Sequence, residues 1–424
     1  MEGDFGSING IIEDYQAVYE ADPARELHAV VPYRQFIDAA YLKDKRNVIE
    51  ARLEEWEHHS VESFAPYMAM CSYSYGLASQ TRGNDRIRNL VDLRLHCGHA
   101  IKLNPKAPYA YGRLVKAARM NKERKEADRW LRRGLSVLPE SYFVRSAYQS
   151  LLSPRHGGSN EEMLAFAEQA QRHADSNPML VRLISDAHDN IGNQHSRNDD
   201  YLKAITSYSK SLEFYVWGNP LISLAASYSA MGENDLAINA LTRAMEVRDS
   251  YYLYKRRARV YSDAGRFEEA LADIETALAA EPDNTDFLRT RANILYKMED
   301  YAAALAVYET LVEVGSATAW DWRRIAYIKQ RKIIDIEAAE RSYIRALALE
   351  PSSNWAWHEF ATLLYNKKDS RAPAAFQTYL DICATGKECD PVLVDRSKKF
   401  VACVNSEPEC SLSTEEYRDW LPGA

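Results

Sequence analysis

The stretch YYLYKRRARVYSDAGRFEEALADIETALAAEP, residues 251–282, decides the fold of this chain. Its first part is typical of a helix that ends at Gly265, because glycine tolerates the left-handed backbone that closes a helix. Its second part places Ala270, Ile274 and Ala277 on one stripe, which is the spacing of an amphipathic helix. The stretch therefore predicts a helical hairpin.

The hairpin is repeated along the second half of the chain. Ala237, Ala270, Ala304 and Ala339 follow one another at spacings of 33, 34 and 35 residues. Each alanine is followed one turn later by a larger side chain: Leu241, Ile274, Tyr308 and Tyr343. A fixed period of about 34 residues is the signature of stacked helix-turn-helix units. We therefore predict an all-α solenoid in which each hairpin buries its stripe against its neighbours.

These units resemble the tetratricopeptide repeat, whose pattern runs from a large residue through Leu-Ala, an aromatic residue, Gly, Ala, a second aromatic residue and Ala to Pro. The resemblance is strong from about residue 201 to residue 366, where successive units stay in phase. It implies an alpha-alpha superhelix of tetratricopeptide-like hairpins. It also favours a protein that holds a partner over one that catalyses a reaction.

The rest of the chain is organised around breaks in this pattern. We predict a divergent helical repeat region at 1–155, a capped helix pair with a loop at 156–200, a regular array at 201–380, and a cysteine-rich tail with a capping helix at 381–424. Within the tail, Ser413 and Glu416 fit a capping box ahead of Tyr417 and Trp420, which we expect to cover the end of the array.

A second resemblance lies at the first break. The run SPRHGGSNEEMLAFAEQA, which begins at Ser153, is similar to a signature of an uncharacterised bacterial family. That signature reads Pro-Arg-Trp-Gly-Gly-Ser followed by Met-Leu-Ala-Phe-Ala, and this chain has His156 in place of the tryptophan. The resemblance implies a bacterial source and often an envelope location, without any established chemistry.

Composition limits the partners. The 424 residues carry a net charge of −8 without a block of like charges, so nucleic acid is not an expected partner. No apolar run is long enough for a spanning helix, so membrane insertion is not expected. The start MEGDFGSING lacks the basic and apolar segments of a signal peptide, although it also fits a mature terminus behind an added methionine.

The tetratricopeptide resemblance places one set of side chains on the concave face, which the first helix of each hairpin lines. The set is Tyr252, Lys255, Arg259, Arg289, Asn293, Tyr296, Lys297, Trp320, Arg323, Tyr327, Trp355 and His358. It resembles, in a different order, the carboxylate-binding groove of chaperone-docking tetratricopeptide domains. Cations flanked by aromatic rings suit an acidic segment of a partner protein. The alternative is that the cations form a solvated face while the rings fill gaps between helices.

The cysteines fall into two groups. Cys71 and Cys97 lie alone in predicted helices and are expected to be buried small apolar residues. The tail contains four disulfide candidates: Cys383, Cys389, Cys403 and Cys410. Pairing of neighbours is one of three connectivities, free thiols are an alternative, and a zinc site is disfavoured by the wide spacing. Disulfides would place the protein in an oxidising compartment such as the bacterial periplasm, rather than the cytoplasm.

Catalysis finds little support, because no nucleophile elbow, zinc-protease motif or nucleotide-binding loop is present. We therefore expect no catalytic residue, no metal and no cofactor. Two alternatives stay open beside the scaffold. One is a bacterial immunity or adaptor protein that neutralises a toxic effector. The other is an enzyme with a site in the N-terminal half, for which His96, His99 and His156 are the residues to inspect. The partner and the oligomeric state are not specified by the sequence.

Overall fold

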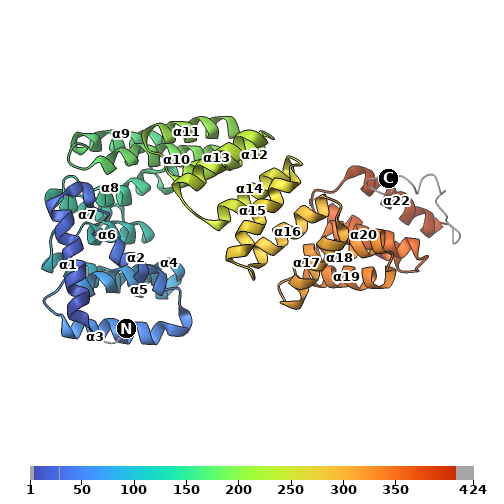
Figure 1. Cartoon of the computed structure of the whole chain (residues 1–424), viewed down its shortest axis with the longest axis horizontal. Coiled ribbons are helices and arrows are strands. Elements are labelled where there is room, and N and C mark those ends of the chain that lie inside the picture. The colour runs from blue at the N-terminus through green and yellow to red at the C-terminus, as the bar shows by residue number, and fades with distance from the viewer. Residues whose placement is uncertain (1–3, 28, 407–424) are drawn as a thin grey trace. The chain divides into compact units, whose positions relative to one another are not determined.

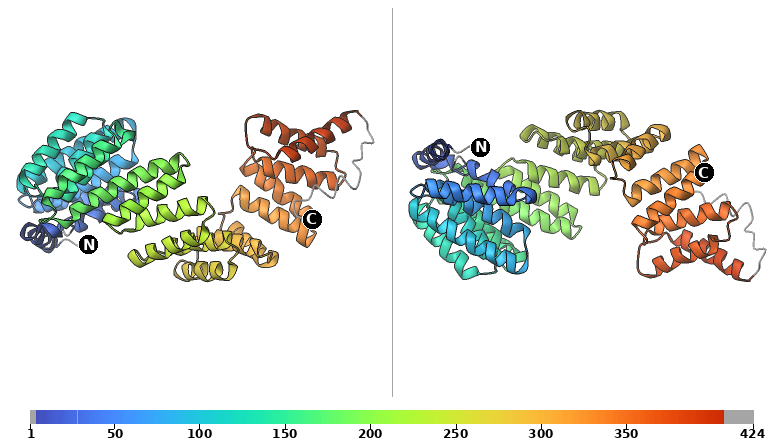
Figure 2. Two further views of the ribbon diagram at one scale, coloured as in Figure 1. Left: turned by 90° about the horizontal axis from the view of Figure 1, so that it is seen from above. Right: turned by 90° about the horizontal axis from the view of Figure 1, so that it is seen from below.

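The computed structural model describes residues 4–27 and 29–406 and is all-α in those ranges, with 22 α-helices and no strand (Figure 1). The chain forms two compact units that divide between Arg248 and Asp249. Within each unit, helices that are neighbours in sequence pack side by side as hairpins (Figure 2). The predicted fold class, a solenoid of helical hairpins, is confirmed.

The first unit contains the divergent repeats and also the first hairpin of the regular period, which carries Ala237. Its helices are α1 (Phe5–Ala21), α2 (Val31–Ala39), α3 (Arg46–His59), α4 (Ala65–Gln80), α5 (Gly83–Leu103), α6 (Pro108–Met120), α7 (Arg124–Val137), α8 (Tyr142–Gln149), α9 (Asn160–Ala170), α10 (Val181–Arg197), α11 (Tyr201–Phe214), α12 (Gly218–Ala230) and α13 (Asn234–Val247). Short 3-10 turns join several of them, including η2 (Lys43–Lys45) before α3 and η6 (Pro178–Leu180) before α10.

The second unit contains the later hairpins of the regular period, which carry Ala270, Ala304 and Ala339. Its helices are α14 (Tyr251–Asp263), α15 (Phe267–Ala280), α16 (Thr285–Lys297), α17 (Tyr301–Glu313), α18 (Ala319–Ile328), α19 (Ile336–Leu349), α20 (Asn354–Asn366), α21 (Ala372–Ala384) and α22 (Pro391–Ser406). A π-helical turn at Lys329–Ile333 absorbs the extra residue of the α18–α19 connection.

The repeated alanines mark where two helices of a hairpin touch. Ala237, Ala270, Ala304 and Ala339 are all 0% exposed. The larger residue one turn later is equally buried, as in Tyr308 at 0%. A small side chain permits close approach of the backbones, and the larger one fills the space beside it. The 34-residue period therefore arises because each hairpin places a small buried residue at the same point of contact between its two helices.

The turns that join the two helices of successive hairpins share a left-handed backbone residue, although the residue type differs from one hairpin to the next. At Gly265, φ is +75°, and the next amide, that of Arg266, donates to the Tyr261 carbonyl at 2.8 Å. Glu299 occupies the same position in the next hairpin, with φ of +63°. The sequence pattern identified only the glycine turns, because a non-glycine residue in this conformation leaves no mark in the sequence.

A buried carboxylate links distant parts of the first unit. Glu26 is 1% exposed and accepts hydrogen bonds from the Ser141 hydroxyl, the backbone amides of Tyr142 and Phe143, and the Asn177 side-chain amide. It therefore caps the N-terminus of α8 from the connection between α1 and α2. Burial raises the pKa of Glu26 to about 7, and the four donors oppose this rise.

The first two cysteines are buried as expected, at 0% exposure, but they do not lie alone. Cys71 on α4 and Cys97 on α5 form a disulfide with a Cα–Cα distance of 5.1 Å. The two helices pack as a hairpin, which brings together thiols that are 26 residues apart. Because this half of the chain has no regular period, the sequence pattern did not predict which helix faces meet.

The C-terminal end of the second unit is closed by a cysteine-containing cap. Cys383 and Cys389 form a disulfide that spans the connection between α21 and α22. On α22, Phe400 is 3% exposed, with its ring 4.9 Å from that of Tyr365. Cys403 is also disulfide-bonded. Cys410 and the predicted capping residues Tyr417 and Trp420 lie outside the described residues.

Candidate functional site

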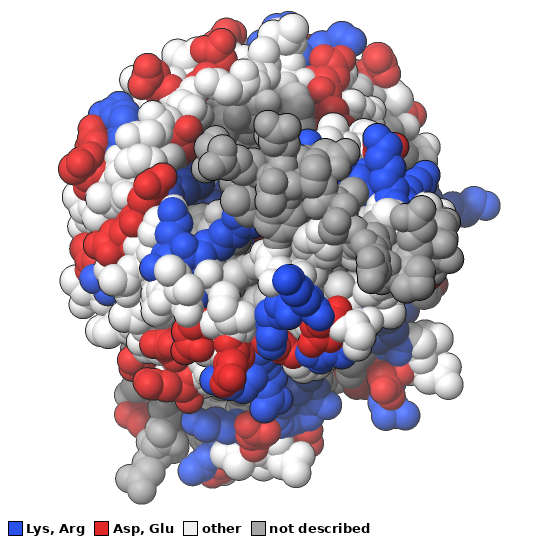
Figure 3. All heavy atoms as spheres, turned by 90° about the vertical axis from the view of Figure 1, so that its right-hand side faces the viewer, with Lys and Arg blue, Asp and Glu red and all other residues white. Residues whose placement is uncertain are grey.

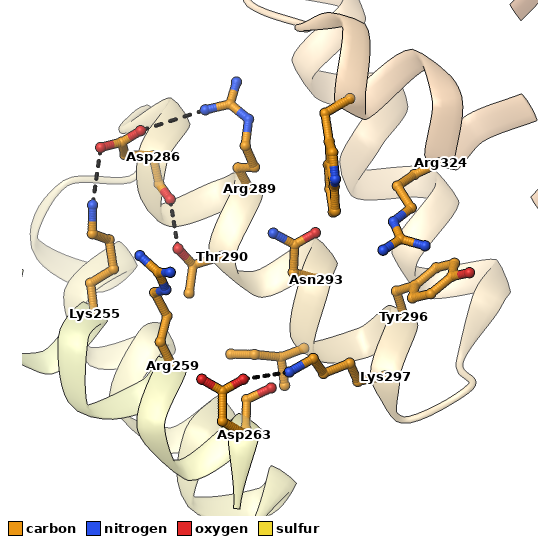
Figure 4. A pocket seen from close by; sticks show the side chains of 13 residues that line it. Lys255, Arg259, Asp263, Asp286, Arg289, Thr290, Asn293, Tyr296, Lys297 and Arg324 are labelled. Carbon is orange, nitrogen blue, oxygen red and sulfur yellow. Dashed lines mark hydrogen bonds and ion pairs between the residues drawn. The ribbon is translucent and has the colours of Figure 1, made fainter. Parts of the chain in front are cut away.

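A polar hollow of about 380 Å³ opens on the second unit where α14, α16 and α18 lie side by side (Figure 4). Its lining residues come from three consecutive hairpins, as expected for the inner face of a repeat array. They are Lys255, Arg259, Ser262, Asp263, Asp286, Arg289, Thr290, Asn293, Ile294, Tyr296, Lys297, Trp320 and Arg324. We call this set the basic hollow.

Three of its cations are held by carboxylates of neighbouring helices. Lys255 donates to Asp286 at 3.0 Å, and this bond holds the pKa of Asp286 below its usual value. Lys297 donates to Asp263 at 2.6 Å (Figure 4). These ion pairs join α14 to α16 and so fix the distance between two helices that line the basic hollow. They also leave less of the positive charge of Lys255 and Lys297 available to a ligand.

Arg289 is the most tightly held of the cations. Its Nε atom lies 2.9 Å from a carboxylate oxygen of Asp321, which is 0% exposed at the start of α18. A second nitrogen donates to the backbone carbonyl of Ser316 at 3.0 Å. Asp321 also accepts hydrogen bonds from Thr318 in a capping box. Arg289 therefore joins two hairpins.

Two guanidinium groups of the basic hollow have no ion pair within the described residues: Arg259 and Arg324. The Arg324 guanidinium lies 4.2 Å from the centre of the Tyr296 ring and 4.6 Å from that of Trp320. Its buried Nε atom has no hydrogen-bond partner. Cation–π contacts orient the group without neutralising it, so its charge stays available.

An amide lies among these cations. Asn293 accepts a hydrogen bond at 2.6 Å from the hydroxyl of Tyr308, a residue of α17. This contact occupies the amide oxygen and leaves the N–H groups as donors toward the basic hollow (Figure 4).

The basic hollow has a positive net charge. Five cations line it, together with the carboxylates of Asp263 and Asp286, and a third carboxylate, that of Asp321, pairs with Arg289. Five positive and three negative charges leave a net charge of +2.

The structure separates the twelve predicted site residues into three groups. Seven of them line the basic hollow: Lys255, Arg259, Arg289, Asn293, Tyr296, Lys297 and Trp320. Three line a small hollow of about 40 Å³ further along the unit: Tyr327, Trp355 and His358. Two line neither: Tyr252 and Arg323.

In the last two groups, Arg323 and His358 are engaged or buried, whereas Tyr252 and Trp355 are half exposed. Arg323 lies 3.7 Å from Glu359, whose pKa is raised by burial. His358 is 5% exposed, and burial lowers its pKa to about 4. Tyr252 is half exposed, with its ring 5.2 Å from the Lys255 ammonium.

The sequence interpretation missed the acidic half of the site and Arg324. The sequence does contain a signal for these carboxylates, because each lies about one repeat from the cation that it pairs with. The separation is 31 residues for Asp286 and Lys255, 32 for Asp321 and Arg289, and 34 for Asp263 and Lys297. Side chains one repeat apart meet across adjacent hairpins. The pairing was therefore open to prediction.

The three histidines of the alternative enzyme site lie in separate surroundings in the first unit. His96 is partly buried beside the Ser74 hydroxyl at 3.3 Å. His99 is exposed, with its ring against the edge of Tyr67, and His156 is exposed beside Ser153 at 3.0 Å. None of the three lines the basic hollow, the small hollow or the apolar cavity formed by α1–α3.

The described residues hold neither a group suited to a metal ion nor a helix suited to a membrane. In residues 4–27 and 29–406, histidine, cysteine and carboxylate side chains do not gather in groups of three or more that could hold a metal ion. None of the helices described has the length and apolar character needed to cross a membrane. On the face shown in Figure 3, basic and acidic side chains are interspersed.

Stacked helical hairpins with a polar hollow on their first helices define a helical-repeat scaffold. Residues 261–320 match the profile of the tetratricopeptide repeat. The match covers 60 of the 424 residues and supports the tetratricopeptide repeats that the sequence predicts for this part of the chain. The similarity to the uncharacterised bacterial family around His156 stays a prediction.

Comparison with curated proteins gives partial matches. Bacteriophage adsorption protein A of Escherichia coli (strain K12) is 24% identical over 323 residues, which cover 71% of this chain and 29% of that protein. DnaJ homolog subfamily C member 3 of Gallus gallus is 24% identical over 169 residues, which cover 34% and 32%. The chain thus spans about a third or less of the length of these relatives.

Comparison with solved structures gives alignments of low similarity. The APC/C hetero-tetramer Cut9-Hcn1 aligns over 93% of this chain and 87% of that chain, with 15% identity and a TM-score of 0.39. YrrB, a TPR protein with an unusual peptide-binding site, aligns over 45% of this chain and 97% of that chain, with 20% identity and a TM-score of 0.34. The tetratricopeptide match over residues 261–320 supports the role of a protein-interaction scaffold.

Proposed function

We propose that this chain is a non-catalytic scaffold that binds an acidic or carboxylate-bearing segment of a partner protein in the basic hollow. The observation that carries the proposal is a pair of guanidinium groups that form no ion pair within the described residues, those of Arg259 and Arg324, on either side of the Asn293 amide (Figure 4). Guanidinium groups and amides together donate the charge-assisted hydrogen bonds that a carboxylate accepts.

The remaining contacts of the basic hollow support this role by holding its walls in place. Lys255 and Arg289 are fixed by Asp286 and Asp321 before any ligand arrives. Walls that are already ordered reduce the entropy lost on binding. The hollow of about 380 Å³ accommodates a few side chains rather than a folded domain. We infer that the ligand is an extended segment or a chain end.

The disulfides favour an oxidising compartment. Cys71–Cys97 and Cys383–Cys389 are both bridged, and such bonds persist outside the reducing cytosol. Together with the bacterial resemblance around His156, this supports a bacterial periplasm as the site of action. Alkylation of thiols in the intact native host tests this point, because the four cysteines should resist labelling until a reductant is added.

A peptide panel tests the binding proposal. Peptides with two or more Asp or Glu residues are compared with the same peptides carrying Asn or Gln, each with a free or an amidated C-terminus. We expect saturable binding of the acidic peptides, with affinity that falls as salt rises. Equal binding of the neutral peptides would contradict the proposal, and comparison of the two C-termini shows whether the chain end or a side chain supplies the carboxylate.

A further inference from the structure

The first unit contains a second hollow of entirely different character. About 740 Å³ is enclosed on three sides by α1, α2 and α3. Its lining is Phe5, Ile8, Ile11, Ile12, Pro32, Gln35, Phe36, Ala39, Lys45, Val48, Ile49, Arg52, Leu53 and Trp56. We call it the apolar hollow. Ile11 and Val48 are 56% and 65% exposed in it, so large aliphatic side chains face solvent there.

The apolar hollow is polarised along α3. At the end of this helix, the Trp56 ring lies 6.2 Å from that of Phe5 and 6.0 Å from that of Phe36. The only charged lining residues are Lys45, just before α3, and Arg52. Arg52 already pairs with Glu55 at 2.6 Å, whereas the Lys45 ammonium has no ion pair within the described residues. One end is thus aromatic, and the other carries a cation available to a ligand.

The dimensions of the hollow suit an extended alkyl chain. From Arg46 to Trp56, α3 rises about 15 Å. The lining residues follow the helix over this length, and the hollow has a volume of about 740 Å³. An alkyl chain that runs along α3 can therefore contact aliphatic side chains near Lys45 and aromatic side chains near Trp56.

We propose that the apolar hollow binds a free fatty acid, with its carboxylate at Lys45 and its alkyl chain directed along α3 toward Trp56. Burial of the chain removes both ligand and aliphatic lining residues from water. The Lys45 ammonium supplies an opposite charge at the solvent-facing end. This site lies in the first unit and is independent of peptide binding in the basic hollow.

Calorimetric titration of the full chain with laurate, below its critical micelle concentration, tests the proposal. We expect one saturable site. Lys45→Glu should weaken laurate binding about tenfold, because attraction becomes repulsion at short range. Lys43→Glu is the matched control, since Lys43 is exposed on the same turn but does not line the hollow. It should change the affinity less than twofold.

Four results would overturn the proposal, and the first three concern the hollow itself. The first is the absence of saturable laurate binding. The second is equal affinity for laurate and dodecanol together with no effect of Lys45→Glu. The third is a dimer in light scattering that Ala39→Trp dissociates, because a second copy of the chain would then cover this face.

Ala39→Trp fills the hollow and should abolish laurate binding. Val48→Glu serves the same purpose if the tryptophan variant does not fold. Vesicles of anionic lipid show whether the chain binds a free fatty acid or a membrane surface. Stronger binding to the vesicles than to free laurate would also overturn the proposal.

Discussion

The hydroxyl of Tyr308 donates a hydrogen bond of 2.6 Å to the side-chain oxygen of Asn293, across the hairpin formed by α16 and α17. The same contact joins Tyr208 to Asn193 at 3.2 Å in the first unit. In both hairpins the tyrosine lies four residues after a buried alanine and fifteen after the amide residue. The same geometry in two hairpins thus sets the direction of the Asn293 amide, which lines the basic hollow.

Tyr308→Phe should separate stability from binding. Loss of the hydroxyl removes a part-buried hydrogen bond and should lower the free energy of unfolding by about 1 kcal/mol. It also frees the Asn293 amide to rotate, so acidic peptides should bind more weakly. Tyr208→Phe is the control, with a similar loss of stability in urea denaturation and unchanged peptide affinity. Equal effects of both variants on affinity would contradict the orienting role of Tyr308.

Glu299→Gly should stabilise the chain. Glu299 has φ of +63°, a conformation that costs a side-chain-bearing residue about 1 kcal/mol and glycine almost nothing. The reciprocal change, Gly265→Ala, should destabilise by a similar amount because φ is +75° there. Urea midpoints measure both. A stabilising effect of Gly265→Ala would show that the turn is not left-handed in solution.

Removal of the Cys71–Cys97 bridge should cost more than removal of the tail bridge. The first closes a separation of 26 residues and the second a separation of 6. From loop-closure entropy, double substitution to alanine should lower the free energy of unfolding by about 3.5 kcal/mol in the first case and about 2 kcal/mol in the second. Thiol titration of the denatured, non-reduced chain provides the independent check. Reactive thiols at Cys71 or Cys97 would contradict the bridge.

His358 should make the chain sensitive to acid. Burial lowers its pKa from 6.5 to about 4, so between these values the unfolded chain binds a proton that the folded chain does not. Stability should therefore fall as pH drops through this window, by up to about 3 kcal/mol. Glu359 has a raised pKa and the opposite slope. Comparison with the His358→Gln variant cancels the contribution of Glu359, because both chains contain this residue. Identical stability–pH profiles of the two chains would contradict the lowered pKa of His358.

The sequence predicted the hairpins well because their determinants are local. A small residue, a larger one a turn later and a terminating glycine all act within one repeat, so Ala270 and Gly265 were sufficient to define a unit. The partner of Cys71 depended on how two irregular helices pack, and nothing local specifies that. Arg324 was missed in favour of Arg323 because one residue on a helix turns a side chain by about 100°.

Charge reversal in the basic hollow tests the central claim most directly. Arg259→Glu combined with Arg324→Glu is compared with Arg256→Glu combined with Arg345→Glu, which carries the same net charge on exposed residues that do not line the hollow. In a fluorescence-anisotropy titration with an acidic peptide, the first pair should weaken binding at least tenfold and reduce its salt dependence, while the second leaves both nearly unchanged. An unaltered affinity of the Arg259→Glu, Arg324→Glu chain, with its helicity intact, would contradict the account.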